Sequence, residues 1–467
     1  MTFDQIAALV VLAAVVGVLI HGRVRADVVA LTGAAALLLL GVVRPVEVQA
    51  AFASPAVIAL AGLFVIAYAL ELSGVLGLLI RQATALAARV GNVGVWIVIG
   101  LCGSVAGFIN NTPVVVLAAP VIRDVARSLN MSPKRFLMPL SYVTVLGGLL
   151  TLIGTSTTLL VNDMARNAGQ PVFGLFEITP VGLIIALAGG LWLFLVGARQ
   201  LDKPARADEE EAEQARLAAE QARARAAESK PKRRRFFQPR RFAEAGAHED
   251  GSGDAHLGDV ALFSAADRPF DLRRALISLG IFALVILAAA LNLAPIAASA
   301  FAGAVALILL RVITAEEAYA GLRPEILLLI AGMVVIGVAI EVTGLAEAGA
   351  DRLIGVIEPL GPLAALAILY GVTLFATELL SNATVAVLVT PIAVALAESL
   401  GVDPRPFLVA VMMAASAAFA TPFGYQTNVL VYQMGGYSYM DFVRIGVPLN
   451  IITWAVAVIT IPLFFPF

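Results

Sequence analysis

The stretch FINNTPVVVLAAP at residues 108–120 returns in similar form as LLSNATVAVLVTP at residues 379–391. A second pair follows, IGTSTTLLVNDM at residues 153–164 and FGYQTNVLVYQM at residues 423–434. In all four stretches, Asn, Gly, Pro or hydroxyl residues interrupt a long apolar run. Interrupted apolar segments at matching places in two halves are typical of secondary transporters, whose broken helices form a site near mid-membrane. The pattern therefore predicts a duplicated membrane fold with a site at the interruptions.

The composition is that of a membrane protein. Hydrophobic residues make up 60% of the 467 residues and charged residues 14%, against roughly 45–50% and about 25% in soluble domains. Many apolar runs reach the ~20 helical residues that cross a hydrocarbon layer of about 30 Å. The sequence thus predicts an all-α polytopic membrane protein.

Several kinds of chemistry lack their residues in this sequence. The single Cys102 excludes an internal disulfide framework and a multi-cysteine metal site. The three histidines, His21, His248 and His256, fall in predicted loops or a linker, so no histidine metal cluster is expected. The sequence has no P-loop and no Ser/His/Asp arrangement, so we expect no enzyme and no nucleotide or nucleic-acid partner.

The distribution of basic residues predicts how the chain crosses the membrane. Two apolar segments, 92–128 and 360–398, have a polar break in the middle. With the N-terminus outside, most Arg and Lys residues fall on the cytoplasmic side if 92–128 is a re-entrant hairpin from the cytoplasm and 360–398 one from outside. The remaining apolar runs predict full spans, at residues 5–21, 27–43, 55–80, 136–164, 177–198, 273–291, 294–312, 323–345, 405–434 and 442–465.

This topology predicts two inverted repeats, residues 1–198 and 272–467, each of five transmembrane helices plus one re-entrant hairpin. Residues 199–271 between them are polar, and the run KPKRRRFFQPRR at 230–241 is strongly basic. We interpret this segment as a cytoplasmic linker, either a solvated tether or one that lies on anionic membrane lipid. Both termini are then outside, in a cell (inner) membrane.

The polar residues of the two hairpins lie at their predicted tips. In the first hairpin they stand between Gly107 and Pro113, where a membrane helix would break. A broken helix exposes carbonyl groups that suit a cation and N–H groups that suit an anion. Helix capping or helix–helix contact is the alternative role for such residues. The predicted substrate-binding residues at the two tips are Asn110, Asn111, Thr112, Ser381, Asn382 and Thr384.

Two full spans are predicted to unwind beside the tips. The stretch IGTSTT at 153–158 interrupts span 136–164, and TPFGYQTN at 421–428 interrupts span 405–434. Neutral oxygen ligands without a carboxylate favour a monovalent cation over Ca²⁺, although single Ser or Thr residues can also bond to the helix backbone. The oxygen-bearing residues are Thr155, Ser156, Thr157, Thr158, Thr421, Gln426, Thr427 and Asn428.

Three carboxylates fall in or near the predicted spans, where charged groups are usually functional. Glu71 and Glu341 occupy matching places near the ends of related spans and could cap an interface or take part in coupling. Glu378, three residues before Ser381, could carry a proton, pair with a cation or lie at the interface.

At these motifs the chain resembles the divalent anion:sodium symporter family, within the ion-transporter superfamily, and most closely its sodium/sulfate permease branch. The resemblance covers most of 27–465 and rests on NNTPVVVLAAPVIRD (110–124), MPLSYVTVLGGLLTLIGTST (138–157) and RIGVPLN (444–450). It implies a homodimeric, elevator-type transporter whose hairpin tips bind the substrate anion. It also implies Na⁺ sites at the tips and unwound spans, here Asn111, Gly154, Thr155, Ser156, Thr157, Asn382, Thr421, Gly424, Gln426, Thr427 and Asn428.

The chain departs from the Ser-Asn-Thr triplets of that family. Asn110 replaces the first Ser, and Ala383 replaces the second Thr, with Thr384 one position later. These departures put direct coordination of the anion by both triplets in doubt, and also full occupancy by Na⁺, which is the expected coupling cofactor.

The sequence therefore predicts Na⁺-coupled symport of a small divalent anion. Sulfate is the first candidate and a C4-dicarboxylate the second. The alternatives are another permease of the superfamily, such as a Na⁺/H⁺ antiporter or an arsenite-type exporter. An antiporter would be expected to carry a buried Asp or Glu in the unwound spans, and we predict none there.

Overall fold

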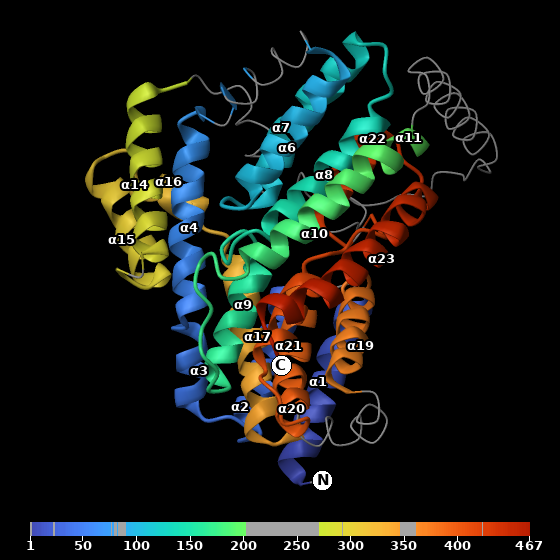
Figure 1. Cartoon of the computed structure of the whole chain (residues 1–467). Coiled ribbons are helices and arrows are strands. Elements are labelled where there is room, and N and C mark those ends of the chain that lie inside the picture. The colour runs from blue at the N-terminus through green and yellow to red at the C-terminus, as the bar shows by residue number, and fades with distance from the viewer. Residues whose placement is uncertain are drawn as a thin grey trace, which may run out of the picture.

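The structure is a computed structural model that describes residues 2–21, 24–75, 90–201, 270–291, 293–345, 361–422 and 424–467, together with residues 77, 78 and 82. Within these ranges every regular element is helical (Figure 1). The predicted all-α fold is therefore confirmed. The predicted linker, residues 199–271, lies outside the described residues except at its two ends.

The helices occur in two series along the chain. The first series is α1 (Phe3–His21), α2 (Ala26–Leu39), α3 (Pro45–Phe52), α4 (Pro55–Leu72), α6 (Asn92–Ala106), α7 (Asn111–Ser128), α8 (Lys134–Gly148), α9 (Ser156–Asn167), α10 (Thr179–Trp192), the π-helical η1 (Leu193–Gly197) and α11 (Ala198–Gln200). The second series is α14 (Leu272–Ala290), α15 (Ile296–Leu309), α16 (Ala315–Gly321), α17 (Pro324–Val342), α19 (Gly361–Ala376), α20 (Asn382–Ser399), α21 (Arg405–Ala415), α22 (Gln426–Gly435) and α23 (Tyr439–Phe464).

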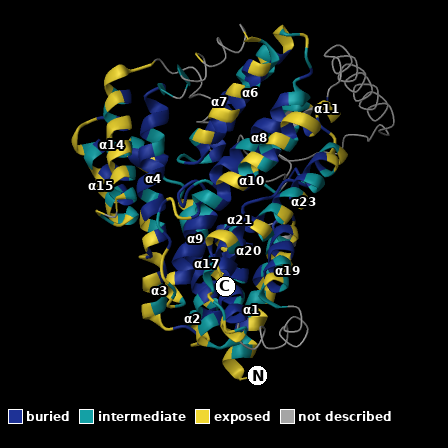
Figure 2. Ribbon diagram, viewed as in Figure 1, coloured by how far each residue is buried: buried dark blue, intermediate teal, exposed yellow. Residues whose placement is uncertain are grey.

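Many of these helices are apolar enough for a membrane. By length and composition, six described segments could each cross a bilayer: Pro45–Leu72, Thr179–Gly197, Leu272–Ala290, Pro324–Val342, Asn382–Ser399 and Tyr439–Phe464. Exposed residues follow the outer sides of α10, α14 and α15 (Figure 2), and they include large apolar ones such as Leu276 and Phe301. An outer surface that remains apolar is the surface that lipid contact requires.

Two short helices were not expected from the sequence. The first, α3, begins after Arg44, whose backbone N–H donates to Glu47 at 2.8 Å. The second, α16, begins after Thr314, which forms a reciprocal capping box with Glu317. Both are too short to give a clear apolar period, and both lie directly before a long helix, α4 or α17.

A tight turn joins α6 to α7 and another joins α19 to α20, within the predicted hairpin ranges. The Asn110 side chain begins α7 by accepting the Thr112 N–H at 3.1 Å. The Ser381 hydroxyl begins α20 in the same way, accepting the Thr384 N–H at 3.2 Å. Capping by Asn or Ser satisfies N–H groups that a helix start leaves free. In Figure 1, α6 and α7 occupy the upper part of the view, and α19 and α20 the lower part.

Both predicted interruptions of long spans are present, but they begin earlier than expected. The chain is non-helical over 149–155, between α8 and α9, and over the described residues 416–422 and 424–425, between α21 and α22. We call these segments the first break and the second break. Six residues of the predicted unwound stretches consequently lie in the first turns of α9 and α22, not in the breaks: Ser156, Thr157, Thr158, Gln426, Thr427 and Asn428.

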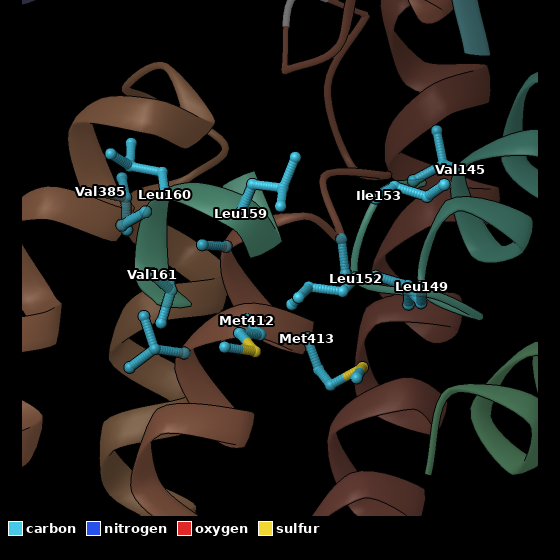
Figure 3. Packing of buried hydrophobic residues seen from close by; sticks show 14 of the residues in the cluster. Val145, Leu149, Leu152, Ile153, Leu159, Leu160, Val161, Val385, Met412 and Met413 are labelled. Carbon is cyan, nitrogen blue, oxygen red and sulfur yellow. The ribbon is translucent and has the colours of Figure 1, made fainter. Parts of the chain in front are cut away.

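The helices pack as two groups. Helices α1–α4 and α14–α17 form the α4/α17 group, in which α4 packs on α15 and α2 on α17. Helices α6–α10 and α19–α23 form the hairpin group, in which α6 packs on α8, α19 on α21 and α10 on α23. The hairpin group is also held by α9, which packs on α20 and α21. Figure 3 shows side chains of this contact, among them Leu160, Val385 and Met412.

Glycines permit the closest crossings in the α4/α17 group. A Cβ atom on Gly62 of α4 would lie 2.6 Å from the carbonyl carbon of Ala300 in α15. A Cβ atom on Gly332 of α17 would lie 2.9 Å from the carbonyl carbon of Ala30 in α2. These distances are too short for any side chain, so both crossings bring two backbones into direct contact.

Candidate substrate and cation site

A cavity of about 420 Å³ lies where both hairpin turns and both breaks meet. Its apolar lining comes from the α4/α17 group and includes Leu63 and Phe64 of α4, Phe282 of α14 and Leu329 of α17. Its polar lining comes from the hairpin group. The predicted site residues in that lining are Asn110, Thr112, Gly154, Thr155, Ser156, Thr157, Ser381, Asn382, Gly424 and Gln426.

Four helices begin at this cavity. The starts of α7, α9, α20 and α22 contribute Asn110, Ser156, Asn382 and Gln426 to its lining. A helix start carries unsatisfied N–H groups and a partial positive charge, and so favours an anion. The described lining contains no Lys, Arg or His, and its ionisable side chains are Glu378 and the phenol of Tyr425. An anion in this cavity would therefore be held by helix starts and neutral donors.

The first hairpin turn is tied to the second break. The Asn111 amide nitrogen donates to the Tyr425 hydroxyl at 3.0 Å. The Thr112 hydroxyl donates to the Gln426 side-chain oxygen at 3.3 Å. Residues from the two halves of the chain therefore form one polar surface. Sequence reasoning missed Tyr425, although it stands inside the quoted FGYQTN stretch, because an aromatic residue there resembled a packing residue.

The side-chain oxygen of Asn111 is an unused acceptor. Asn111 is 1% exposed, and its Oδ1 has no hydrogen-bond partner among the described residues. Gly148 lies next to it, since a Cβ atom there would be 3.3 Å from Oδ1 and 2.8 Å from the Thr155 methyl group. A buried acceptor without a donor is costly, and a cation would satisfy it. The chemistry of Asn111 and its hydroxyl neighbours therefore fits Na⁺.

Hydroxyl groups line the first break. The Thr155 hydroxyl accepts the Thr158 N–H at 3.3 Å and lies 3.3 Å from the Ser416 hydroxyl in the second break. The Thr158 hydroxyl lies 2.7 Å from the Leu152 carbonyl and so turns inward, away from the cavity. Ser416 was not predicted, because it is a single small polar residue at the end of an apolar run.

The second hairpin turn is closed by its own contacts. The Ser381 and Thr384 hydroxyls are 2.6 Å apart, and Thr384 is fully buried behind the cavity. The Thr377 hydroxyl lies 2.7 Å from the Asn382 side-chain oxygen and 2.9 Å from the Ala415 carbonyl. Asn382 lines the cavity, whereas Thr384 supports the turn from inside.

Three further predicted residues lie behind the second break, outside the cavity lining. The Ser141 hydroxyl of α8 lies 2.8 Å from the Thr427 hydroxyl and 2.7 Å from the Asn428 side-chain oxygen. The Asn428 amide nitrogen donates to the Ala418 carbonyl at 3.0 Å. The Thr421 hydroxyl accepts the Gly424 N–H at 3.0 Å. These contacts fix the shape of the break. Ser141 is a supporting residue that the sequence analysis did not select.

The three carboxylates differ in position. Glu378 borders the cavity and is only 9% exposed, and its carboxylate faces the second break. Glu71 lies at the end of α4 and Glu341 at the end of α17, and neither lines the cavity. The Glu378 carboxylate is therefore buried against the second break. A fourth carboxylate, Asp163 of α9, lies within the predicted span 136–164 and is 3% exposed, so the expectation that the unwound spans carry no buried acidic residue is wrong.

Broken helices that meet at a polar cavity, in a helical fold with an apolar outer surface, are typical of a membrane transporter. The family described as citrate transporter matches this chain over residues 15–404 and 379–467. The chain belongs to the citrate transporter family. As predicted, it is a transporter and not an enzyme.

Similar proteins agree with this assignment. An uncharacterized transporter of Synechocystis is 27% identical, with 91% of each chain covered. An uncharacterized transporter of Escherichia coli is 27% identical, with both chains covered completely. Sodium/sulfate cotransporter 1 of Chlamydomonas reinhardtii is 34% identical over 29% of this chain and 16% of its own. The predicted resemblance to sodium/sulfate permeases is thereby confirmed.

The YdaH transporter of Alcanivorax borkumensis superposes with a TM-score of 0.43 and 12% identity, covering 89% of this chain and 86% of that one.

Proposed function

We propose that this transporter carries a small divalent anion together with Na⁺, and that sulfate is its substrate. The observation that carries this proposal is the convergence of four helix starts on one cavity whose described lining has no cationic side chain. Helix starts and amide groups favour a dianion, and bound Na⁺ would balance the rest of its charge. Asn110, Asn111, Thr112, Ser381 and Asn382 would bind the anion, with Thr384 supporting its turn.

The support for Na⁺ comes from the first half of the chain. Asn111 Oδ1 is a buried acceptor without a donor, and it lies beside Thr155 and Gly148. Neutral oxygens of this kind suit a monovalent cation better than a divalent one. The name of the sodium/sulfate cotransporter in Chlamydomonas reinhardtii agrees with this choice of coupling ion. Two Na⁺ sites would follow, one at each break.

A C4-dicarboxylate, or a larger carboxylate such as citrate, is the second candidate. The family description points to a carboxylate, and a cavity of about 420 Å³ is within the range of small-molecule sites, about 300–1,000 Å³. The apolar lining from Leu63, Phe64 and Leu329 would contact the carbon chain of such a substrate. Sulfate has no apolar part, so an apolar wall gives it no contact.

We also propose two inverted repeats that work by an elevator motion. Gly62 and Gly332 correspond across the halves, as do Ala30 and Ala300, and each glycine lies against the alanine of the other half. A two-fold relation between the halves would produce such reciprocal contacts. The cavity lies at the boundary of the α4/α17 group and the hairpin group. Sliding of the hairpin group would therefore carry the whole polar lining across the membrane.

Three further expectations complete the proposal. The resemblance implies a homodimer in the membrane lipid of the cell (inner) membrane. The positive-inside pattern implies termini outside and a cytoplasmic linker at 199–271. Accessibility labelling of single cysteines in spheroplasts, placed at Thr2 and at Arg273, would test this orientation after replacement of Cys102.

Reconstituted protein tests the transport claim directly. Proteoliposomes loaded with K⁺ are given labelled sulfate or succinate with external Na⁺ or K⁺. We expect Na⁺-dependent sulfate uptake, and competition by succinate would identify a shared carboxylate site. Asn111→Ala and Asn382→Ala should abolish uptake while the protein remains monodisperse. Uptake of both anions at the same rate in K⁺ and in Na⁺ would refute the coupling.

A further inference from the structure

Glu378 has an unusual set of contacts for a carboxylate in an apolar protein. It stands in the turn between α19 and α20, at the border of the cavity. Its Oε1 accepts the Phe419 N–H at 2.8 Å, the Ala420 N–H at 2.7 Å and the Asn450 amide at 2.8 Å. Its Oε2 accepts the Thr421 N–H at 2.9 Å and the Thr421 hydroxyl at 3.0 Å. The carboxylate thus joins the second hairpin turn, the second break and α23.

All five partners are donors, and this matters for the role of Glu378. A carboxylate ion accepts only, so five donors match it fully. Four of the five donors are N–H groups, and the fifth is the Thr421 hydroxyl, which also lies 3.3 Å from the Glu378 backbone carbonyl. The contacts therefore give the Glu378 carboxylate a role in shaping the backbone around it.

The backbone that Glu378 holds is the backbone that would bind the second Na⁺. Three consecutive N–H groups, from Phe419 to Thr421, point at the carboxylate. Peptide carbonyls point away from their own N–H groups, so anchoring the N–H groups fixes the direction of the carbonyls of the break. Gly424, a predicted Na⁺ ligand, is adjacent, since a Cβ atom on it would lie 3.1 Å from Glu378 Oε2.

In the first half of the chain, the hairpin turn is joined to the first break without a carboxylate. Gly107 occupies the position that corresponds to Glu378, and its backbone carbonyl accepts the Thr151 hydroxyl. Thr421, which corresponds to Thr151, makes the related contact to the Glu378 backbone carbonyl at 3.3 Å. The two breaks therefore share one contact, and the carboxylate anchor is an addition at the second break.

We propose that Glu378 is a positioning residue that holds the second break in the shape that binds a coupling Na⁺. The carboxylate also supplies a negative charge next to that site, which the first half lacks. The two proposed Na⁺ sites are then unequal, and the second one is the tighter. This inference rests on the proposed Na⁺ coupling, but it concerns a residue that does not itself contact the anion.

The test measures Na⁺ binding without transport. Purified full-length protein is heated in NaCl and choline chloride mixtures of constant ionic strength, and the Na⁺ concentration that gives half of the thermal shift is recorded. For Glu378→Gln we expect this concentration to rise at least tenfold, because the amide nitrogen faces the Thr421 N–H and the charge is gone. The Na⁺ dependence of sulfate uptake should also lose its steepness, with a Hill coefficient falling toward one.

Two other variants separate positioning from general stability. Asn450→Ala removes one of the five donors but keeps the charge, so we expect a smaller rise, about threefold, and this variant also serves if Glu378→Gln does not fold. Trp454→Phe removes the bond from the indole N–H to the Ala367 carbonyl, 2.9 Å long and also made by α23. It should lower the melting temperature and leave the half-saturating Na⁺ concentration unchanged.

The outcomes distinguish this inference from the proposed function. Equal half-saturating Na⁺ concentrations in wild type, Glu378→Gln and Asn450→Ala would overturn the positioning role and leave coupling intact. A rise in Trp454→Phe equal to that in Glu378→Gln would also overturn it, because general loosening would then suffice. A wild type that Na⁺ does not stabilise at all would overturn both proposals.

Discussion

At the scale of single residues, Asn111 connects most of the site. Its amide nitrogen is committed to Tyr425, so its orientation is fixed and Oδ1 faces a place with no donor among the described residues. The sequence predicted Asn111 at a hairpin tip, because Asn between Gly and Pro in an apolar run breaks a helix, and Asn111 is the first residue of α7, directly after the hairpin turn. Its role as a site residue stays a prediction. The partner Tyr425 could not be predicted, since it depends on how two distant segments meet.

Replacement of Asn111 tests its role as a cation ligand. For Asn111→Ala we expect loss of Na⁺-dependent thermal stabilisation at the first site and at least a tenfold loss of uptake. Asn162→Ala is the matched control. Asn162 is also a buried asparagine of the first half, and it accepts the Phe173 N–H at 2.7 Å away from the cavity. That change should cost about 1–3 kcal/mol of stability and leave the Na⁺ dependence as in wild type.

Tyr425 tests whether the two halves of the site depend on one another. In Tyr425→Phe the ring remains and the hydroxyl that holds Asn111 is lost. A hydrogen bond of this kind is worth about 0.5–1.5 kcal/mol, so we expect uptake to fall about threefold to tenfold through weaker Na⁺ binding. Initial rates at several Na⁺ concentrations measure this, and wild-type rates at low Na⁺ would contradict the dependence of the first site on the second break.

At the scale of elements, the sequence and the structure agree on the kinds of element but differ at their ends. Asn, Gly and Pro mark the hairpin turns clearly, because these residues act on the backbone locally. The first break begins at Leu149, and the second begins at Ser416 and continues through Ala417 and Ala418, within runs whose composition predicts helix. Their non-helical course is set by packing, for example by the Tyr142 hydroxyl, which donates to the Phe419 carbonyl at 2.6 Å. Sequence patterns contain no signal for such a contact.

The breaks are covered by helices that approach them through glycine. A Cβ atom on Gly182 of α10 would lie 2.1 Å from the Leu149 carbonyl oxygen, whereas one on Gly190 of the same helix meets nothing within 4 Å. We therefore expect Gly182→Ala to lower the melting temperature strongly and to abolish uptake. Gly190→Ala should leave uptake unchanged and add up to about 1 kcal/mol, because Ala favours helix over Gly. Equal melting temperatures for the two variants would show that α10 can move away from the first break without loss of stability.

At the scale of the whole molecule, the cavity lies between the two helix groups, so the proposed elevator motion requires one group to slide past the other. Contacts within a group must persist during transport, and contacts between groups must change. One contact between groups joins Gly337 of α17 to Val387 of α20, where a Cβ atom on Gly337 would lie 3.3 Å from a Val387 methyl carbon. One contact within the α4/α17 group joins Gly303 of α15 to Val285 of α14, where a Cβ atom on Gly303 would lie 2.7 Å from a Val285 methyl carbon.

These two contacts allow a paired cross-linking experiment after Cys102→Ala. In both pairs the Cβ atom on the glycine would lie within 3.3 Å of a side-chain carbon of the valine, so a cysteine at each position would bring two thiols near one another. The Cβ atom at position 337 would also crowd the Met164 side chain at its flexible end, which can move aside. Oxidation of Gly337→Cys with Val387→Cys should stop sulfate uptake, and reduction should restore it, because the bond fixes the hairpin group to the α4/α17 group. Oxidation of Val285→Cys with Gly303→Cys should leave uptake intact, since both helices belong to one group. Full uptake with the Gly337–Val387 bond formed would mean that the two groups do not slide past each other, and transport would then have to proceed by movement of the hairpin turns alone.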